Sequence, residues 1–313
     1  MISAPRKAKQ FFTAVVKLLV VGGAFYFIYS QLVNNDKLDW VQFQEKFRAN
    51  WSVLGIGFIL LLSVLNRYFE ILKWQNLAQS IKPISVGEST KQVLSAVTAA
   101  IFTPNGLGEY GAKVLFFEKD KTKEVIFLNL ICNGIQMVLT VVFGIFGLLY
   151  FNTLFQVISG KTVLLIFASL VIFIIFLFSV RRIQIRGYSL QKLIQKINLL
   201  PKEVHRRNIL LAVCRYLVFS HQYYFLFLAF DVDLPYLTLM SGITATYFLA
   251  SSLPTFQFLD FAVKGSVAVY FFGLLGVNEW IVVFIAMLMW FLNVVLPVII
   301  GSYYVLNFKS KWK

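Results

Sequence analysis

The chain has 313 residues, of which 59% are hydrophobic, 17% aromatic and only 14% charged. A soluble globular domain carries about 45–50% apolar and about 25% charged residues, so this composition excludes that class. A net charge of +15 would suggest nucleic acid as the partner of a soluble protein, but here the apolar residues gather in charge-free runs over 125–160, 162–180, 234–259 and 280–308. A helix needs roughly 20 such residues to cross a bilayer core. The sequence therefore predicts an all-α polytopic membrane protein whose partners are membrane lipids, not nucleic acid.

Six spanning helices are predicted in chain order, over 11–33, 51–74, 124–150, 162–180, 207–230 and 280–307. The first is interpreted as an uncleaved span rather than a signal peptide. Two further apolar regions, 85–118 and 235–275, are interrupted by Pro104-Asn105-Gly106 and by Pro254. The legs of the first region are too short to cross the membrane at 1.5 Å per residue, which predicts a re-entrant hairpin. The second region is either a hairpin or two short, kinked spans.

Basic residues gather on one side of this topology. The outer segments contain only Lys37, Lys46, Arg48 and Lys161, whereas the N-terminus, the loops before 124 and after 180, and the C-terminal tail are rich in Lys and Arg. Loops with many basic residues stay on the cytoplasmic side of a membrane. We therefore expect both termini on the cytoplasmic side of a bacterial-type inner membrane.

The pattern of the chain repeats after 151 residues, a shift that carries Glu109 onto Asp260 and Lys113 onto Lys264. It also superposes the predicted spans at 11 and 162, and two amphipathic surface segments, 37–50 and 188–201. Each half of the single membrane domain, 1–161 and 162–313, then consists of a span, a surface helix, a span, a hairpin and a span. Because three crossings are an odd number, the halves form an inverted repeat, the architecture of many secondary transporters.

Two acid–lysine pairs lie inside these apolar stretches. Glu109 precedes Lys113, and Asp260 precedes Lys264, by four residues, which places both members of each pair on one helix face. A charge in hydrocarbon costs about 2.5 kcal/mol or more. The pairs therefore either neutralise each other to make the hairpins tolerable, or line a cavity and exchange partners with a charged ligand.

The first hairpin contains a turn suited to anions. Pro104 ends its first leg, while Asn105, Gly106 and Gly108 permit a tight turn and close approach of the backbone. The second leg would then begin with free backbone N–H groups and the positive end of a helix dipole. This segment is not a phosphate-binding P-loop, because GxxxxGK[ST] is absent.

Arg67 and Arg215 each precede a tyrosine in the second span of their half. Arg67 lies near the predicted inner helix end and is expected to snorkel rather than to bind a ligand, while Glu70 and Lys73 are expected to form a surface ion network there. Arg215 lies deeper, as a ligand contact or a structural partner. The candidate substrate-binding residues are Arg67, Asn105, Gly106, Gly108, Glu109, Lys113, Arg215, Asp260 and Lys264.

No catalytic residue, cofactor or metal site is predicted, since no cluster of His, Cys and acidic residues has metal-ligand spacing. One enzyme alternative remains. Asp231-Val232-Asp233 superficially resembles an acidic metal motif of glycosyltransferases, but the loop between Phe230 and Tyr236 has only five residues. Such a short loop favours a solvated turn.

The stretch from Arg67 to Lys113 resembles a known family. An Arg…Trp helix end, Arg67 to Trp74, is followed by TPNGLGE at residues 103–109. This is similar to the lysylphosphatidylglycerol synthase transmembrane-region family, whose members show a TPGxxGE-like signature at this position. The layout of nearly the whole chain resembles that family as well, although the second half keeps Pro254 and Asp260 without the glycines.

The resemblance implies a membrane domain that translocates lipids, aminoacylated phosphatidylglycerol in the bifunctional members. In those members a soluble C-terminal domain makes the aminoacyl ester; this chain ends at Lys313, so we expect the flippase-like part without the synthase. The leading hypothesis is a translocator of an anionic or aminoacylated phospholipid, or of another envelope lipid. The alternatives are a secondary transporter for a small anionic solute and a non-transporting accessory protein for envelope glycolipid assembly. A homo-oligomer is left open.

Overall fold

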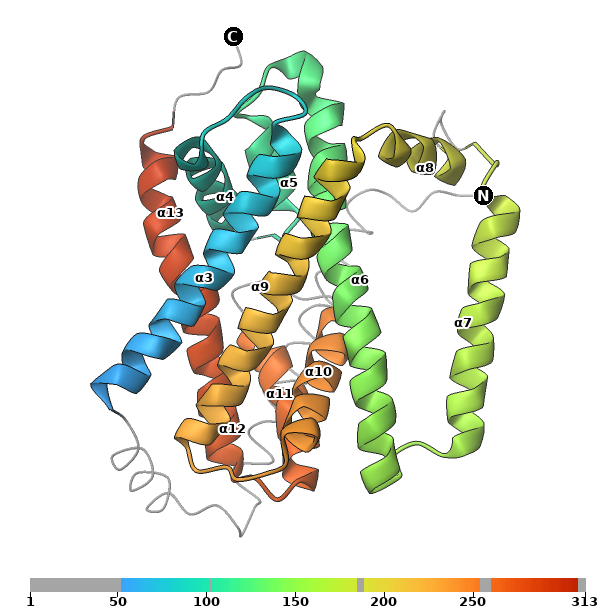
Figure 1. The fold of residues 1–313 in the computed structure, drawn as a ribbon, viewed down its shortest axis with the longest axis vertical. Helices are drawn as coiled ribbons and strands as arrows, with labels where there is room; N and C mark the ends of the chain where they lie inside the picture. Colours follow the sequence, from blue (N-terminus) through green and yellow to red (C-terminus); the bar gives the residue numbers. More distant parts are fainter. Residues whose placement is uncertain (1–51, 102, 185–188, 254–259, 309–313) are drawn as a thin grey trace, which may run out of the picture.

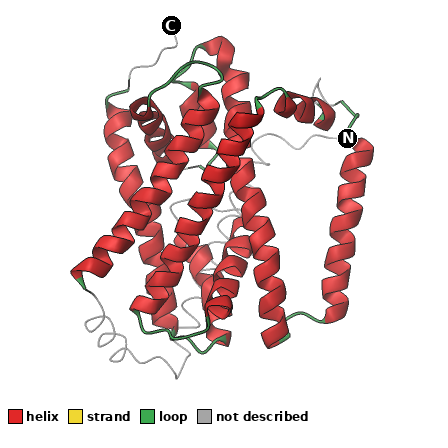
Figure 2. Cartoon of the chain, viewed as in Figure 1, coloured by secondary structure: helices red, strands yellow, loops and turns green. Residues whose placement is uncertain are grey.

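A computed structural model describes residues 52–101, 103–184, 189–253 and 260–308. These residues form helices joined by loops, with no strand among them (Figure 2), as the composition predicted. In chain order the elements are α3 (Val53–Ala78), α4 (Val86–Ala100), α5 (Gly108–Val114), the 3₁₀ helix η1 (Lys119–Lys121), α6 (Thr122–Phe155), α7 (Gly160–Val180), α8 (Leu190–Asn198), α9 (Lys202–Ala229), α10 (Tyr236–Ser252), α11 (Asp260–Leu274), α12 (Glu279–Trp290), the π-helix η3 (Phe291–Val295) and α13 (Leu296–Leu306).

Four helical runs in the described part of the chain are long and apolar enough to cross a membrane, which identifies a membrane protein by length and composition: Val53–Ala78, Lys119–Phe155, Lys202–Ala229 and Glu279–Leu306. They coincide with the predicted spans at 51–74, 124–150, 207–230 and 280–307. The predicted segment 162–180 forms α7, a helix of 21 residues. The predicted span 11–33 and the surface segment 37–50 lie outside the described residues.

The long helices run in alternating directions (Figure 1). In that view α3 rises while α9 descends beside it, and α6 descends while the continuous run from α12 through η3 to α13 rises. The short helices α4 and α5 lie near the upper end, and α10 and α11 lie in the lower half. The two pairs of short helices therefore enter the bundle from opposite ends.

The first hairpin is shorter than predicted. Its first leg, α4, begins at a capping box in which Ser85 and Glu88 satisfy each other's backbone N–H groups. Asn105 and Gly106, with φ of 48° and 68°, make the tight turn that was predicted. The second leg, α5, has only seven residues. In the second region, α10 and α11 are two helices of 17 and 15 residues, while Pro254 lies outside the described residues.

Glycines bring two pairs of helices close together. A Cβ at Gly147 of α6 would collide with the Thr244 hydroxyl on α10, and a Cβ at Gly301 of α13 would collide with the Thr98 hydroxyl on α4. Both threonine hydroxyls donate to the carbonyl four residues back in their own helix, at 3.0 Å for Thr98 and 2.9 Å for Thr244. Because hydrocarbon supplies no hydrophobic force between helices, such close backbone contact is a main source of attraction. The short helices α4 and α10 are thus each held against a long helix in the same way.

Replacing Gly147 or Gly301 by leucine should therefore destabilise the bundle by about 1–3 kcal/mol, the usual cost of forcing extra methylenes into a packed contact. Thermal unfolding of the purified protein in mild detergent measures the change. Gly134→Leu on α6 is the matched control, because a Cβ at Gly134 meets no atom within 4 Å. Equal melting temperatures for Gly147→Leu and Gly134→Leu would contradict the proposed contact.

Candidate functional site

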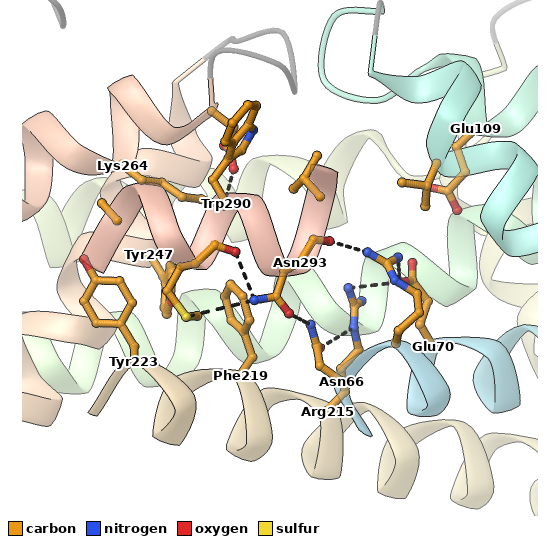
Figure 3. Close-up of a pocket in the computed structure, with 16 residues that line it drawn as sticks. Asn66, Glu70, Glu109, Arg215, Phe219, Tyr223, Tyr247, Lys264, Trp290 and Asn293 are labelled. Carbon is orange, nitrogen blue, oxygen red and sulfur yellow. Dashed lines mark hydrogen bonds and ion pairs between the residues drawn. The ribbon is translucent and has the colours of Figure 1, made fainter. Parts of the chain in front are cut away.

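A polar cavity of about 240 Å³ lies where α3, α9, α11 and α12 converge (Figure 3). Pockets for drug-sized ligands typically have volumes of about 300–1,000 Å³, so this cavity is smaller than most of them. Its ionisable lining is balanced, with three acids and three bases. The lining residues are Asn66, Arg67, Glu70, Val97, Glu109, Arg215, Phe219, Tyr223, Tyr247, Asp260, Lys264, Ala286, Met289, Trp290, Asn293 and Val294.

Glu70 holds two arginines at the crossing of α3 and α9. One of its carboxylate oxygens, Oε2, accepts from Arg67 on the same helix and lies 3.2 Å from Nη2 of Arg215 on α9. The Glu70 side chain is only 8% exposed. A carboxylate in this position keeps its charge in a poorly hydrated interior because two guanidinium groups face it.

The expected snorkelling of Arg67 and the expected surface network of Glu70 and Lys73 were wrong. Helix α3 continues to Ala78, beyond the predicted end, and so keeps all three residues inside the bundle. The ammonium group of Lys73 is buried and donates to the carbonyl of Cys132 at 2.9 Å and to the Gln136 side chain at 3.3 Å. Within the described ranges it has no ion-pair partner.

A backbone carbonyl gives Arg67 its second partner. Nη2 of Arg67 donates to the carbonyl oxygen of Asn293 at 2.5 Å, within the π-helix η3. Pro297 stands four residues after Asn293 and has no N–H, so the usual helical donor to that carbonyl is missing. Proline thus removes the α-helical donor to this carbonyl, and π-helical turns of this kind are frequent at functional sites.

Buried amides connect α3, α9 and η3 across the same region. The side chain of Asn66 donates to that of Asn293 at 2.7 Å, and Asn293 donates to that of Gln222 at 3.0 Å. Gln222 in turn donates to the Ser63 hydroxyl at 2.8 Å. Asn66 also accepts from Nε of Arg215 at 3.2 Å, so the amide chain ends on the arginine that faces the cavity (Figure 3).

The predicted pair Glu109–Lys113 forms, and Lys113 is fully enclosed. Its ammonium group lies 2.6 Å from Glu109 Oε1 and 2.7 Å from Asn129 Oδ1, and 4.2 Å from the centre of the Trp74 ring. Only Glu109 of this pair lines the cavity. Lys113 therefore holds Glu109 in place from behind rather than facing the cavity itself.

The predicted pair Asp260–Lys264 also forms, at 2.5 Å, and here both members line the cavity. The Lys264 side chain is 28% exposed, compared with 1% for Lys113. Its ammonium group lies 5.9 Å from the ring centres of both Phe219 and Tyr247. The two acid–lysine pairs thus differ in burial: Lys113 is enclosed, whereas Lys264 is accessible from the cavity.

A second cavity of about 170 Å³ adjoins the first and shares Asn66, Arg215, Phe219, Tyr247 and Lys264 with it. Around the two cavities, the buried hydroxyls of Tyr216, Tyr223 and Tyr247 have no hydrogen-bond partner among the described residues. Buried polar groups in native proteins nearly always have a partner. Three hydroxyls are therefore ready to donate to water or to a ligand.

The turn residues do not reach the cavity. Asn105, Gly106 and Gly108 are absent from its lining. The expectation of free backbone N–H groups was wrong as well. The N–H of Gly108 donates to the Thr103 hydroxyl at 2.7 Å, and the N–H of Glu109 donates to the Gly106 carbonyl at 3.0 Å. Gly108 is instead required by close packing, since a Cβ there would collide with the backbone of α4.

The other candidates lie apart from the cavity. Asp231 and Asp233 occupy the exposed turn between α9 and α10, where the N–H of Asp233 donates to the Asp231 carbonyl. His221, also outside the cavity lining, is hydrogen-bonded to the Leu217 carbonyl and the Tyr236 hydroxyl at a partly exposed position. No group of three or more His, Cys, Asp or Glu side chains positioned to hold a metal ion occurs over the described ranges.

Sequence reasoning missed the residues that join the helices. Asn66, Gln222 and Asn293 are buried amides in apolar helices, and Glu70 is a buried acid. Such amides were a usable signal, because a polar side chain in a spanning helix usually faces the bundle interior and hydrogen-bonds across it. Their partners, 71 to 227 residues away, could be found only in the folded chain.

No protein-family model matches this chain, and a search of curated proteins finds no match. The resemblance to the lysylphosphatidylglycerol synthase transmembrane region therefore rests on the motif letters given above.

Removing the charge of Glu70 should strongly destabilise the protein. Glu70→Gln leaves Arg67 and Arg215 facing each other without a carboxylate, and breaking a buried ion pair in this way costs about 3–5 kcal/mol. Thermal unfolding in mild detergent measures the loss. The control is Glu203→Gln, which removes an exposed pair with Arg206 and should change stability little. If both variants melt at the same temperature, Glu70 does not hold α3 to α9.

Proposed function

We propose that the protein is a lipid translocator that moves an anionic or aminoacylated phospholipid across a bacterial-type inner membrane. The observation that carries the proposal is the charged cavity within the helical bundle, between α5 and α11. Charged groups inside a membrane are expensive and typically line substrate pathways. The headgroup enters the cavity while the acyl chains remain in the surrounding lipid.

The charge balance around the cavity favours an anion. The lining holds Arg67, Arg215 and Lys264 against Glu70, Glu109 and Asp260, and the ammonium group of Lys113 pairs with Glu109 from behind. Four bases then oppose three acids. A phosphate makes this cluster more nearly neutral by accepting from Lys264 and Arg215, which are the partly exposed cations.

The acids suit the second part of the proposal. Glu109 and Asp260 lie on the second legs of the two hairpins and face the cavity. They balance the bases when the cavity is empty. They also hold a cationic aminoacyl group when the phospholipid carries one, and the unpartnered tyrosine hydroxyls of Tyr223 and Tyr247 supply further donors.

An inverted repeat with about six spans is part of the proposal. It is supported by the opposite directions of α3 and α9, and of α6 and the run from α12 to α13 (Figure 1). The glycine–threonine contacts between α6 and α10 and between α13 and α4 support it too. Broken helices that meet near the midplane from opposite sides are the usual binding site in such architectures.

The cytoplasmic placement of both termini is supported by the charge of the two ends. One end of the bundle, the upper end in Figure 1, contains the start of α6, the end of α7, helix α8 and the start of α9. Basic residues gather there: Lys119, Lys121, Lys123, Arg181, Arg182, Lys192, Lys196, Lys202, Arg206 and Arg207. The opposite end carries the exposed acids Asp231 and Asp233 and a single described lysine, Lys161. This distribution follows the positive-inside rule.

Lipid movement should depend on Lys264. In vesicles that contain a fluorescent anionic phospholipid, Lys264→Met together with Asp260→Asn should slow scrambling about tenfold or more, because a lost charged hydrogen bond is worth roughly 1.5–3 kcal/mol. Glu109→Gln with Lys113→Met should slow it as well. The matched control is Lys121→Met with Glu124→Gln, an exposed pair outside the cavity. Unchanged scrambling in both cavity variants would remove the proposed site.

A secondary transporter for a small anionic solute is the second candidate, favoured by the limited volume of the cavity. The same vesicles separate the two. Uptake of a water-soluble organic phosphate that Lys264→Met abolishes, with no lipid scrambling by the unmodified protein, would replace the lipid proposal with this one.

A further inference from the structure

A further and larger cavity lies on the outside of the bundle, between α6, the end of α7 and α8. Its volume is about 1130 Å³, and it shares no lining residue with the two central cavities. In Figure 1, α7 runs apart from α6, to which a loop joins it at the lower end, and α8 lies near the upper ends of both. We call this space the α6–α8 groove.

The walls of the α6–α8 groove are apolar. Ile126 and Leu130 come from α6, Phe176 and Val180 from α7, and Leu193 from α8. Ordinary small-molecule pockets have volumes of about 300–1,000 Å³, and this groove is larger. Because its surface is mostly apolar, it suits long hydrocarbon chains.

Three lysines stand where the groove meets α8. Lys123 is the second residue of α6, and Lys192 and Lys196 are one turn apart on α8. The nearest acid in sequence, Glu124, is 3.9 Å from Lys121, which is outside the groove. Helix α8 contains no acidic residue. The mouth of the groove is therefore positively charged, and its floor is hydrocarbon-like.

The orientation of α8 fits a membrane surface. Leu193 and Ile197 pack on the core cluster that includes Phe127, and Lys196 lies 4.4 Å from the centre of the Phe127 ring. The helix thus carries apolar residues on one face and lysines on another, as helices that lie in the headgroup layer do. In a bilayer this orientation would place its lysines at headgroup depth, with the groove running alongside α6 and α7 toward the hydrocarbon.

We propose that the α6–α8 groove is a binding site for an anionic diacyl phospholipid, separate from the proposed transport cavity. The phosphate lies among Lys123, Lys192 and Lys196, and the acyl chains fill the space between α6 and α7. Lysine clusters next to a spanning helix are a recognised basis for preferring anionic lipids. The bound lipid then forms part of the contact between α7 and the rest of the bundle.

Brominated lipids test this proposal on the full chain. Leu130→Trp places a fluorophore in the groove, and Phe146→Trp places one on an exposed position of the same helix. The native tryptophan signal of the unmodified protein is subtracted. In phosphatidylcholine vesicles with a small fraction of brominated phosphatidylglycerol, quenching at position 130 should exceed quenching at 146. Each lysine near the surface should enrich the anionic lipid about fivefold.

The charge of the three lysines should cause that enrichment. In the Leu130→Trp protein, the triple change Lys123→Gln, Lys192→Gln and Lys196→Gln should reduce quenching to the level of position 146. Changing Lys119, Lys202 and Arg207 to glutamine removes the same charge from exposed positions outside the groove and should leave quenching unchanged.

Three results would overturn the proposal: equal quenching at 130 and 146, equal losses in the two triple variants, or no quenching at 130 by brominated lipid of either headgroup. The last would mean that protein fills the groove. None of these results depends on scrambling, so the groove and the transport cavity are tested separately.

Discussion

A carboxylate between two guanidinium groups, at the crossing of α3 and α9, is the interaction on which the interior of this protein depends. Glu70 can remain charged away from water because Arg67 and Arg215 face it, and each arginine is tolerable there for the same reason. The three side chains come from two long helices that pack along their lengths. Because these side chains pair with one another, polar groups can remain between the two helices. The cavity is therefore a product of the main helix–helix contact and not an addition to it.

The short helices complete this arrangement because close contacts determine their positions. Gly147 and Gly301 let α10 and α4 approach their long neighbours to backbone distance. The legs that follow, α11 and α5, then carry Asp260 and Glu109 to the cavity. Contacts between uncharged residues therefore determine where Asp260 and Glu109 lie. A change of volume at either glycine is transmitted to the ionic groups, because packed helices do not deform continuously.

Much of the fold could be predicted from local rules, and most of the site could not. Charge-free runs identify helices, and four-residue spacing identifies Glu109–Lys113 and Asp260–Lys264, because both depend on neighbours in sequence. Glu70 was assigned to the surface because the end of α3 was placed too early, so a few residues of helix changed its environment from water to interior. Asn293 acts on Arg67 through its carbonyl, and neither that contact nor the enclosure of Lys113 has a local signature.

The carbonyl of Asn293 has a consequence for how this sequence can diverge. Every amino acid carries a main-chain oxygen, so the anchor for Arg67 survives any replacement at 293 that preserves the helix. At 297 proline is the residue without an amide hydrogen, so the α-helical hydrogen bond to that oxygen is not made. A proline that looks like a helix breaker in the sequence therefore favours a charge-assisted hydrogen bond from the neighbouring helix.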